Sequence, residues 1–326
     1  MRGIGRLSFF VVALALLSGC EQPQTYPDDP HAALKVGWTQ LGSAEYDRAI
    51  EAFQHALKHA APNSRDALLA RFGLASTEQS RKPTPNYDEA ARLFQELATA
   101  DKGGEIGAWS ALAIVRMQHL KLYEVGHGGT KSTLPTTAEL DSVRDGYKGV
   151  IALFPGRDAA DEAAMFIGAS YIEQVETEQI DKGVAYLQQW IGSHNSGPYL
   201  THAYGLLASA FEIEARGNPE KWNAVLTALM ASVKNNEHAR DDELSAAYYR
   251  IARIAELKTK QPEIAKEYYW KLKKMFPTDQ RIFYCNRALL ELGEKVDDIP
   301  VDPLDAVPAP AAGKPTLPES DKEGAK

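Results

Sequence analysis

The chain has 326 residues, and 44% of them are hydrophobic, which is enough material for a core of considerable size. It carries 36 Lys and Arg residues against 44 Asp and Glu residues, a formal charge of −8, and no basic block. This balance argues against nucleic acid and anionic lipid headgroups as partners.

The N-terminus has the pattern of an export signal. A short basic segment with Arg2 and Arg6 precedes the apolar run Leu7–Leu17, which is too short to span a bilayer as a permanent helix. The run ends in Leu17-Ser18-Gly19-Cys20, which resembles the lipobox of bacterial lipoproteins. The alternative is an ordinary secreted protein that happens to have a cysteine at this place.

The lipoprotein resemblance implies a specific processing. Residues 1–19 would be a signal peptide, cleavage would precede Cys20, and acyl chains on Cys20 would hold the protein on a membrane. Glu21 follows the cysteine where an aspartate would usually retain a lipoprotein at the inner membrane, so the resemblance implies the periplasmic face of the outer membrane, with the inner or plasma membrane as the alternative if the organism or the sorting differs. We expect no cofactor besides this covalent lipid.

Cysteine usage is consistent with this prediction. With Cys20 lipidated, Cys285 has no partner in the mature chain, which excludes a disulfide framework and a cysteine-based metal site. Cys285 follows Phe283 and Tyr284 on an apolar helical stretch, which favours a buried structural thiol.

Composition divides the mature chain into three parts. Residues 20–30 are polar and proline-rich, typical of a flexible tether. Residues 296–326 contain six prolines among Asp, Ala, Lys and Glu, so this acidic tail is predicted to be disordered. The body, residues 31–295, has a helical period almost throughout and no convincing alternation of strand residues, so we predict an all-α fold.

An internal repeat organises this body. Within Ala44–Leu57, Ala49 is followed four residues later by Phe53, and Gly37 lies one helix earlier. The same relation recurs with Ala90, Phe94 and Gly73. These segments resemble the tetratricopeptide repeat, a helical hairpin in which small residues allow close approach of helices and aromatic residues fill the gaps.

Weaker copies extend the array along the body. Their spacing exceeds the repeat's usual length of about 34 residues, partly because Lys82–Pro85 and a longer stretch from about Gly126 to Thr137 are inserted. The resemblance implies an α-solenoid of about six helical hairpins, with a capping helix over Gln280–Leu292. The equivalent positions of the six second helices are Ala49, Ala90, Val143, Gly183, Trp222 and Ala265.

A concave groove lined by the first helix of each hairpin would bind envelope proteins. Many of its positions are apolar, so their side chains could instead pack on neighbouring repeats. The predicted groove positions are Trp38, Leu41, Ile114, Met117, Ile172, Tyr204, Phe211, Arg250 and Ile254.

The sequence contains no strong motif for catalysis, metal binding or phosphate binding. His55 and His59 have the spacing of two metal ligands on a helix, but no HExxH motif or nearby third ligand accompanies them in sequence, so we predict no metal site. Gly126–Thr133 resembles a phosphate-binding loop, but Val125 and Thr130 stand where the motif requires glycine, and a helix rather than a strand precedes it. No catalytic residues are predicted, and we expect a protein that is not an enzyme.

Three functions therefore remain open. The first is a lipid-anchored scaffold that supports assembly of an outer-membrane or secretion complex. The second is a pilotin or chaperone that escorts one outer-membrane client, and the third is a binder of glycans or small molecules in the solenoid groove, with Trp38 and Tyr204 as stacking residues.

Overall fold

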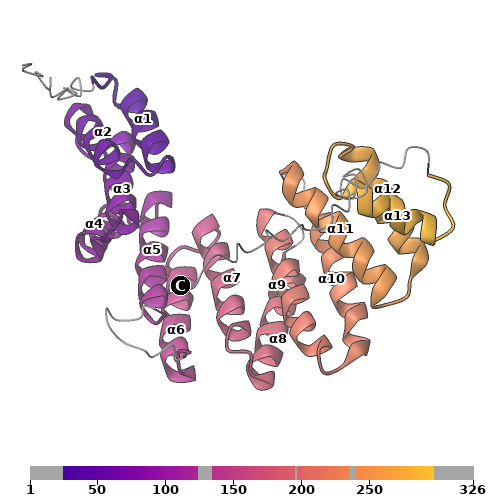
Figure 1. The fold of residues 1–326 in the computed structure, drawn as a ribbon. Coiled ribbons are helices and arrows are strands. Elements are labelled where there is room, and N and C mark those ends of the chain that lie inside the picture. Colours follow the sequence, from indigo (N-terminus) through magenta and orange to yellow (C-terminus); the bar gives the residue numbers. More distant parts are fainter. Residues whose placement is uncertain (1–24, 124–133, 195–196, 235–239, 297–326) are drawn as a thin grey trace, which may run out of the picture. The chain divides into compact units, whose positions relative to one another are not determined.

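The computed structural model describes residues 25–123, 134–194, 197–234 and 240–296. The regular elements in these residues are all helical, which confirms the predicted all-α class (Figure 1). The predicted signal peptide, Cys20, the phosphate-loop-like stretch Gly126–Thr133 and nearly all of the tail lie outside the described residues. None of the described helices is long and apolar enough to cross a membrane.

The described helices form six consecutive pairs and a final single helix, as the repeat pattern predicts. The predicted capping helix is α13, and a short 3-10 helix, Pro219–Lys221, precedes α10. The pairs are α1 (Pro30–Gly42) with α2 (Tyr46–His59), α3 (Arg65–Ser80) with α4 (Tyr87–Ala100), α5 (Glu105–Lys121) with α6 (Thr137–Leu153), α7 (Asp158–Ile172) with α8 (Thr177–Ser193), α9 (Pro198–Ala215) with α10 (Trp222–Lys234) and α11 (Asp241–Leu257) with α12 (Pro262–Met275), followed by α13 (Ile282–Glu291).

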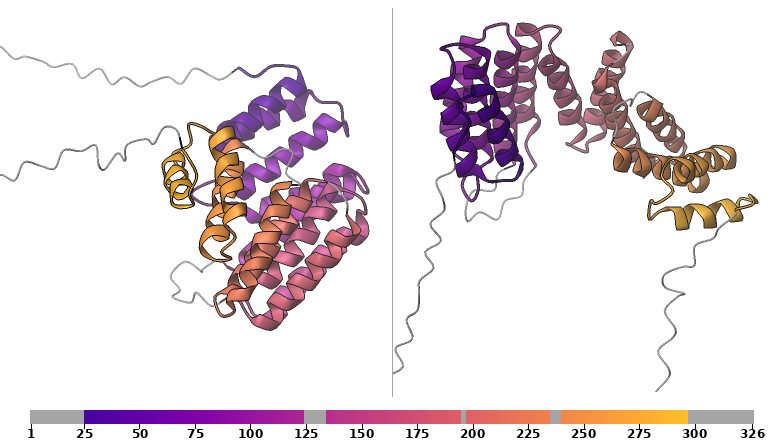
Figure 2. Two further views of the ribbon diagram at one scale, coloured as in Figure 1. Left: turned by 90° about the vertical axis from the view of Figure 1, so that its right-hand side faces the viewer. Right: turned by 90° about the horizontal axis from the view of Figure 1, so that it is seen from above.

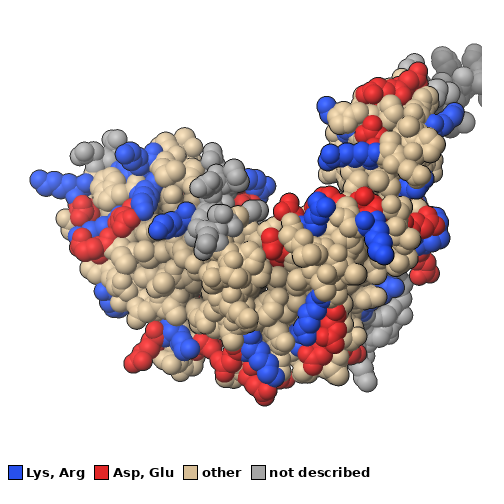
Figure 3. All heavy atoms as spheres, turned by 180° about the vertical axis from the view of Figure 1, so that it is seen from behind, with Lys and Arg blue, Asp and Glu red and all other residues tan. Residues whose placement is uncertain are grey.

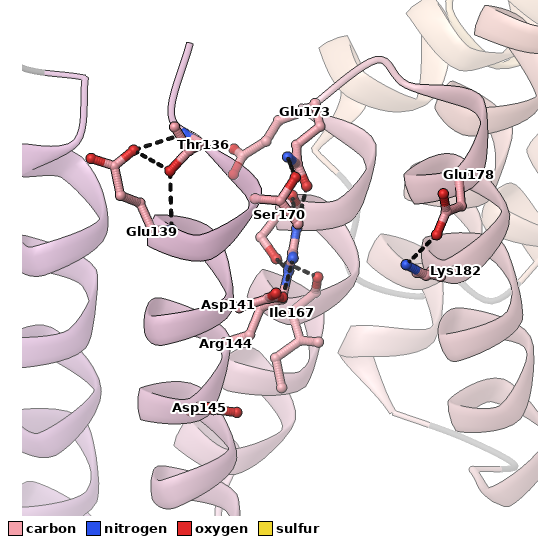
Figure 4. A network of polar contacts seen from close by, with 12 residues as sticks. Thr136, Glu139, Asp141, Arg144, Asp145, Ile167, Ser170, Glu173, Glu178 and Lys182 are labelled. Atoms are coloured by element: carbon pink, nitrogen blue, oxygen red, sulfur yellow. Dashed lines mark hydrogen bonds and ion pairs between the residues drawn. The ribbon is translucent and has the colours of Figure 1, made fainter.

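Local sequence signals fix where several helices begin. Asp29 Oδ2 accepts the Ala32 N–H at 2.9 Å at the start of α1, and Ser64 Oγ accepts the Ala67 N–H at 3.2 Å at the start of α3. At α6, Thr136 and Glu139 form a capping box (Figure 4). The predicted turn Lys82–Pro85 separates α3 from α4, because two prolines cannot continue the first helix.

The chain divides into two compact units within α5, at Ile114 and Val115. In the first unit, α2 packs between α1 and α3, and α1 lies beside α3. In the second unit, α7 packs against α6, α8 and α9, and each later helix contacts the next (Figures 1 and 2). The second helix of a pair therefore also packs on the first helix of the next pair at α2 with α3 in the first unit, and at α6 with α7, α8 with α9 and α10 with α11 in the second unit.

Phe53 shows how the first unit achieves this packing. Its ring is fully buried between α1 and α3, opposite Gly37 and Gly73. A methyl group at Gly37 would come within 2.6 Å of Phe53 Cε1, and one at Gly73 would come closer still. The two glycines are therefore required by the aromatic ring, which confirms their predicted role in close helix approach.

The spacing of four residues seen in Ala49 and Phe53 also accounts for the buried residues of the other second helices. In each of the six second helices, the side chain four residues after the equivalent repeat position is buried, with at most 2% exposure. These side chains are Phe53, Phe94, Tyr147, Leu187, Leu226 and Tyr269. Trp222 is the exception among the six equivalent positions themselves, since it is a large residue and only half-buried, whereas the other five are buried.

Candidate functional site

Three of the nine predicted groove residues are part of the core. Met117 is 3% exposed, and Ile172 and Ile254 are each 7% exposed. Ile172 and Ile254 belong to the large apolar cluster of the second unit. For these positions the alternative of packing between repeats is correct, and a partner could not reach them without rearranging the core.

The groove residues of the first unit behave differently. Trp38 is 37% exposed, with its ring centroid 5.0 Å from that of Phe53 and 6.3 Å from that of Phe72. Leu41 is half-buried against the core of the unit, and Ile114 is also half-buried. Trp38 is thus partly exposed to solvent while its ring packs on the buried Phe53 and the half-buried Phe72.

An apolar cleft of about 500 Å³ lies between α3 and α5, and we call it the N-terminal cleft. Its wall on α3 uses positions 65, 68, 69 and 72, which face one side of the helix. Charged side chains of both signs, Arg65, Asp101 and Glu105, border it. Its apolar lining consists of Leu68, Leu69, Phe72, Ile106 and Trp109.

Two structural details hold this cleft in shape. The Phe72 ring meets the buried Phe94 ring edge to face, with centroids 5.4 Å apart, so its orientation is set by the core. Asp101 Oδ2 accepts the N–H of Gly107 at 2.9 Å and so links the turn after α4 to the first turns of α5. Both walls of the cleft are therefore preorganised.

A second apolar cleft, of about 460 Å³, lies over α9 between α8 and α10, and we call it the C-terminal cleft. It brings together two predicted groove residues, Tyr204 and Phe211. The Lys221 ammonium lies 5.8 Å from the centre of the Phe211 ring, within reach of a cation–π contact. The remaining lining residues are Gln188, Ile191, Leu207, Asn223, Ala224, Thr227 and Ala228.

The last predicted groove residue, Arg250, is exposed and pairs with Glu212, so its charge is already compensated. Figure 3 shows that basic and acidic side chains are intermixed along the edges of the second unit, with mostly uncharged surface between them on that face. Contacts on that face would therefore be largely apolar or hydrogen-bonded, without a charge of one sign to direct them.

A polar network joins α6 to α7 in the second unit (Figure 4). Its centre is Arg144, whose side chain is 1% exposed. Arg144 Nε donates to Ser170 Oγ at 2.8 Å, Nη2 to the Ser170 carbonyl at 2.7 Å and to Gln174 Oε1 at 2.9 Å, and Nη1 to Asp141 Oδ1 at 2.7 Å. The guanidinium also lies 3.8 Å from the centre of the Tyr171 ring. This network is a structural link, because the guanidinium is occupied by the chain's own acceptors.

A second polar contact lies nearby at Tyr147. Its hydroxyl is 3.1 Å from His119 Nδ1, and His119 Nε2 is 2.8 Å from Glu173 Oε1. Burial raises the pKa of Tyr147 above its ordinary range, so the hydroxyl keeps its proton. These two contacts of His119 therefore tie α5, α6 and the end of α7 together.

The two groups singled out in the sequence for their chemistry have different outcomes. Cys285 is fully buried, which confirms the predicted buried thiol, and burial raises the pKa of this thiol to about 12. The expectation that no third ligand lies near His55 and His59 is wrong. The carboxylate of Asp28 lies beside them, brought there by the fold from a segment distant in sequence.

Sequence reasoning missed most of the N-terminal cleft. Phe72 directly precedes the repeat glycine Gly73, and Trp109 is a half-buried tryptophan on a first helix. The signal that could have revealed them is the apolar spacing of positions 68, 69 and 72 on α3, which defines a face in addition to the one that packs on Phe53.

Comparisons with known proteins give a distant structural similarity. No family model matches the sequence, and no curated protein matches it. One solved structure that resembles the chain is titled "Crystal structure of PilW, widely conserved type IV pilus biogenesis factor", with 16% sequence identity and a TM-score of 0.44. The match covers 78% of this chain and 96% of that chain. Similarity at this level identifies neither a family nor a function for this chain.

Proposed function

We propose that the chain is a lipid-anchored, non-enzymatic scaffold of the cell envelope that binds partner proteins through its apolar clefts. The lipobox-like Leu17–Cys20 segment supports the anchor, and the stack of helical pairs supports the role in protein binding. The partners would be components of an outer-membrane or secretion complex, met at the periplasmic face of the outer membrane.

The N-terminal cleft carries this proposal. Its α3 wall presents Leu68, Leu69 and Phe72 on one face, and Ile106 and Trp109 of α5 form the opposite wall. Apolar walls of this kind suit an amphipathic helix, which inserts side chains spaced three or four residues apart. The charged border of Arg65, Asp101 and Glu105 would then fix the direction of the inserted helix.

A glycan or small molecule is the alternative ligand, because the volume of the cleft lies within the usual range of roughly 300–1,000 Å³ for ligand sites. The lining favours a protein segment, because the apolar walls offer few of the hydrogen-bonding groups that a sugar requires. An escort role would use the same cleft, and it differs only in whether the protein remains in the finished complex.

Site-specific photocrosslinking in the envelope tests the proposal. A photoreactive amino acid at Leu68 should give a discrete adduct with a partner protein, whereas the same group at exposed Glu96 on α4 should not. The adduct should disappear when Trp109→Ala is added, because the opposite wall of the cleft is lost. An equal adduct from Glu96, or none from either site, would contradict protein binding in this cleft.

The anchor is tested separately with Cys20→Ala. This variant should stay folded but accumulate uncleaved at the inner membrane, as followed by membrane fractionation and the mass of the N-terminal peptide. Normal processing and sorting would disprove the lipid anchor and leave the cleft untouched.

A further inference from the structure

Three potential metal ligands converge at the start of the first unit. His55 and His59 lie one turn apart on α2, and their rings stack with centroids 4.4 Å apart and planes inclined by 20°. Asp28, from the segment before α1, places Oδ1 3.7 Å from His55 Nε2. One donor atom of each of the three side chains lies within 4.8 Å of the others.

Contacts on both sides of Asp28 hold its segment against α2 and at the start of α1. The Tyr26 hydroxyl donates to Glu51 Oε2 at 3.0 Å and approaches the Arg48 carbonyl at 3.3 Å, and its ring centroid lies 5.7 Å from that of His55. On the other side, Asp29 caps α1. The end of the predicted tether (residues 20–30) is thus packed on the folded body. The contacts of Tyr26 and Asp29 place Asp28 beside the two histidines.

The imidazole of His55 lacks a partner for one nitrogen. His55 Nε2 is shielded from solvent and has no hydrogen-bond partner among the described residues, and the 3.7 Å to Asp28 Oδ1 is too long for a hydrogen bond. Zinc binds both imidazole nitrogen and carboxylate oxygen at about 2.0–2.2 Å, so an ion between these atoms would span a gap of this size. The structure therefore presents a nitrogen that a metal ion would satisfy.

The other two ligands can adjust. The Asp28 side chain is 89% exposed, and His59 is exposed as well, so both can rotate toward an ion without disturbing the core. Their exposure also leaves room for a water molecule as a fourth ligand, as in zinc sites with three protein ligands. Two imidazoles with one carboxylate suit zinc and related transition metals, whereas magnesium and calcium prefer oxygen ligands alone.

We propose that Asp28, His55 and His59 form a binding site for a divalent transition-metal ion of the Zn²⁺ class. Bound metal would fasten the segment before α1 to α2. If Cys20 carries the lipid, only eight residue steps, or at most about 30 Å of extended chain, separate the anchor from this clamp. This consequence rests on the proposed anchor, and the metal site itself does not.

Metal binding is measured on the full-length chain, purified in detergent and stripped with a chelator. The stripped protein is titrated with Zn²⁺, with no other metal present, and a chromophoric chelator competes for the ion and reports binding. We expect one Zn²⁺ per chain in the unmodified protein. His59→Ala and Asp28→Asn should each weaken binding at least as much as the loss of an outer-shell partner, which costs roughly 10–100-fold. Both side chains are exposed, so neither variant should unfold the protein.

Matched controls are His31→Ala, an exposed histidine on α1, and Asp47→Asn, an exposed aspartate on α2. Both should bind Zn²⁺ as the unmodified chain does. The proposal is wrong if no Zn²⁺ binds, if His59→Ala and Asp28→Asn bind as tightly as the controls, or if Mg²⁺ displaces Zn²⁺ at comparable concentration.

Hydrogen exchange tests the clamp. Zn²⁺ should slow exchange in peptides that contain residues 25–29 in the unmodified chain and leave it unchanged in His59→Ala. Binding without any slowing in this segment would show that Asp28 is not a ligand and would overturn the proposed site.

Discussion

The two units join their helical pairs by different chemistry. In the first unit, the apolar ring of Phe53 fills the space opposite two glycines, Gly37 and Gly73. In the second unit, the link between α6 and α7 depends on the buried Arg144, and Tyr147, which occupies the repeat position of Phe53, bonds to His119 through its hydroxyl. The same repeat therefore accommodates two kinds of contact between neighbouring helical pairs, which we call the apolar joint (at Phe53) and the polar joint (at Arg144).

The comparison shows what each kind of joint requires. The apolar joint depends on shape, so it is sensitive to a single added methyl group. The polar joint depends on satisfying every hydrogen bond, so it is sensitive to the loss of one partner. The polar joint occurs beside the long insertion after α5, where the helices of the third pair are not held by a short turn.

Arg144→Ala should have the largest effect. It removes four hydrogen bonds from a side chain that is 1% exposed, leaves Ser170 and Gln174 short of a donor and opens a cavity. Disrupting a buried charged network of this kind costs about 3–5 kcal/mol. The free energy of unfolding should fall accordingly, measured by urea denaturation with hydrogen exchange of α6 and α7 peptides to locate the loss.

Arg92→Ala serves as its control, because Arg92 is exposed and its ion pairs within the described part of the chain are with Glu89 and Glu96 on its own helix. It should change stability little. An Arg144→Ala variant as stable as Arg92→Ala would show that the α6–α7 joint is apolar after all, like the joint at Phe53.

Gly73→Ala tests the apolar joint and should have an intermediate effect. The added methyl group would overlap the Phe53 ring, and overpacking of this kind costs about 1–3 kcal/mol, which exceeds the helix-propensity gain of up to about 1 kcal/mol. Gly149→Ala on α6 is the matched control, since its methyl group would meet nothing within 4 Å. Melting temperatures should therefore move in opposite directions, down for Gly73→Ala and up for Gly149→Ala.

A rescue sharpens this test. Phe53→Leu should cost less in the Gly73→Ala background than in the unmodified chain, because the smaller side chain relieves the overlap. Equal costs in the two backgrounds would mean that Phe53 and position 73 do not compete for the same space.

The apolar joint could be predicted from sequence, and the polar joint could not. A small residue followed four positions later by an aromatic is a repeated pattern, so Ala49, Phe53 and Gly73 could be placed without coordinates. The role of Arg144 depends on Ser170 and Gln174, which lie on the next helix in no repeated relation. The only local signal is its position between the apolar residues Leu140 and Tyr147 on one helix face.

The candidate sites show the same division. The repeat frame located the first helices, but it could not tell which of their apolar residues face the core, so Met117, Ile172 and Ile254 were indistinguishable from Tyr204 and Phe211. Whether an apolar residue on a first helix is buried or lines a cleft depends on how closely the neighbouring helices pack around it. The Asp28 carboxylate was missed because it precedes α1 and is distant in sequence from His55. The two side chains are close only because the fold places the segment before α1 beside α2.

The smallest effect is expected for Tyr147→Phe, which makes the third pair resemble the first two. The variant keeps the ring but removes the hydroxyl from His119 Nδ1, and a lost hydrogen bond of this kind costs about 0.5–1.5 kcal/mol. A double-mutant cycle with His119→Ala should give a coupling energy of about 1 kcal/mol between the two side chains. Additive costs would show that the Tyr147 ring alone supports the third pair, so that the two units would then share one apolar mechanism at this repeat position and differ only at Arg144.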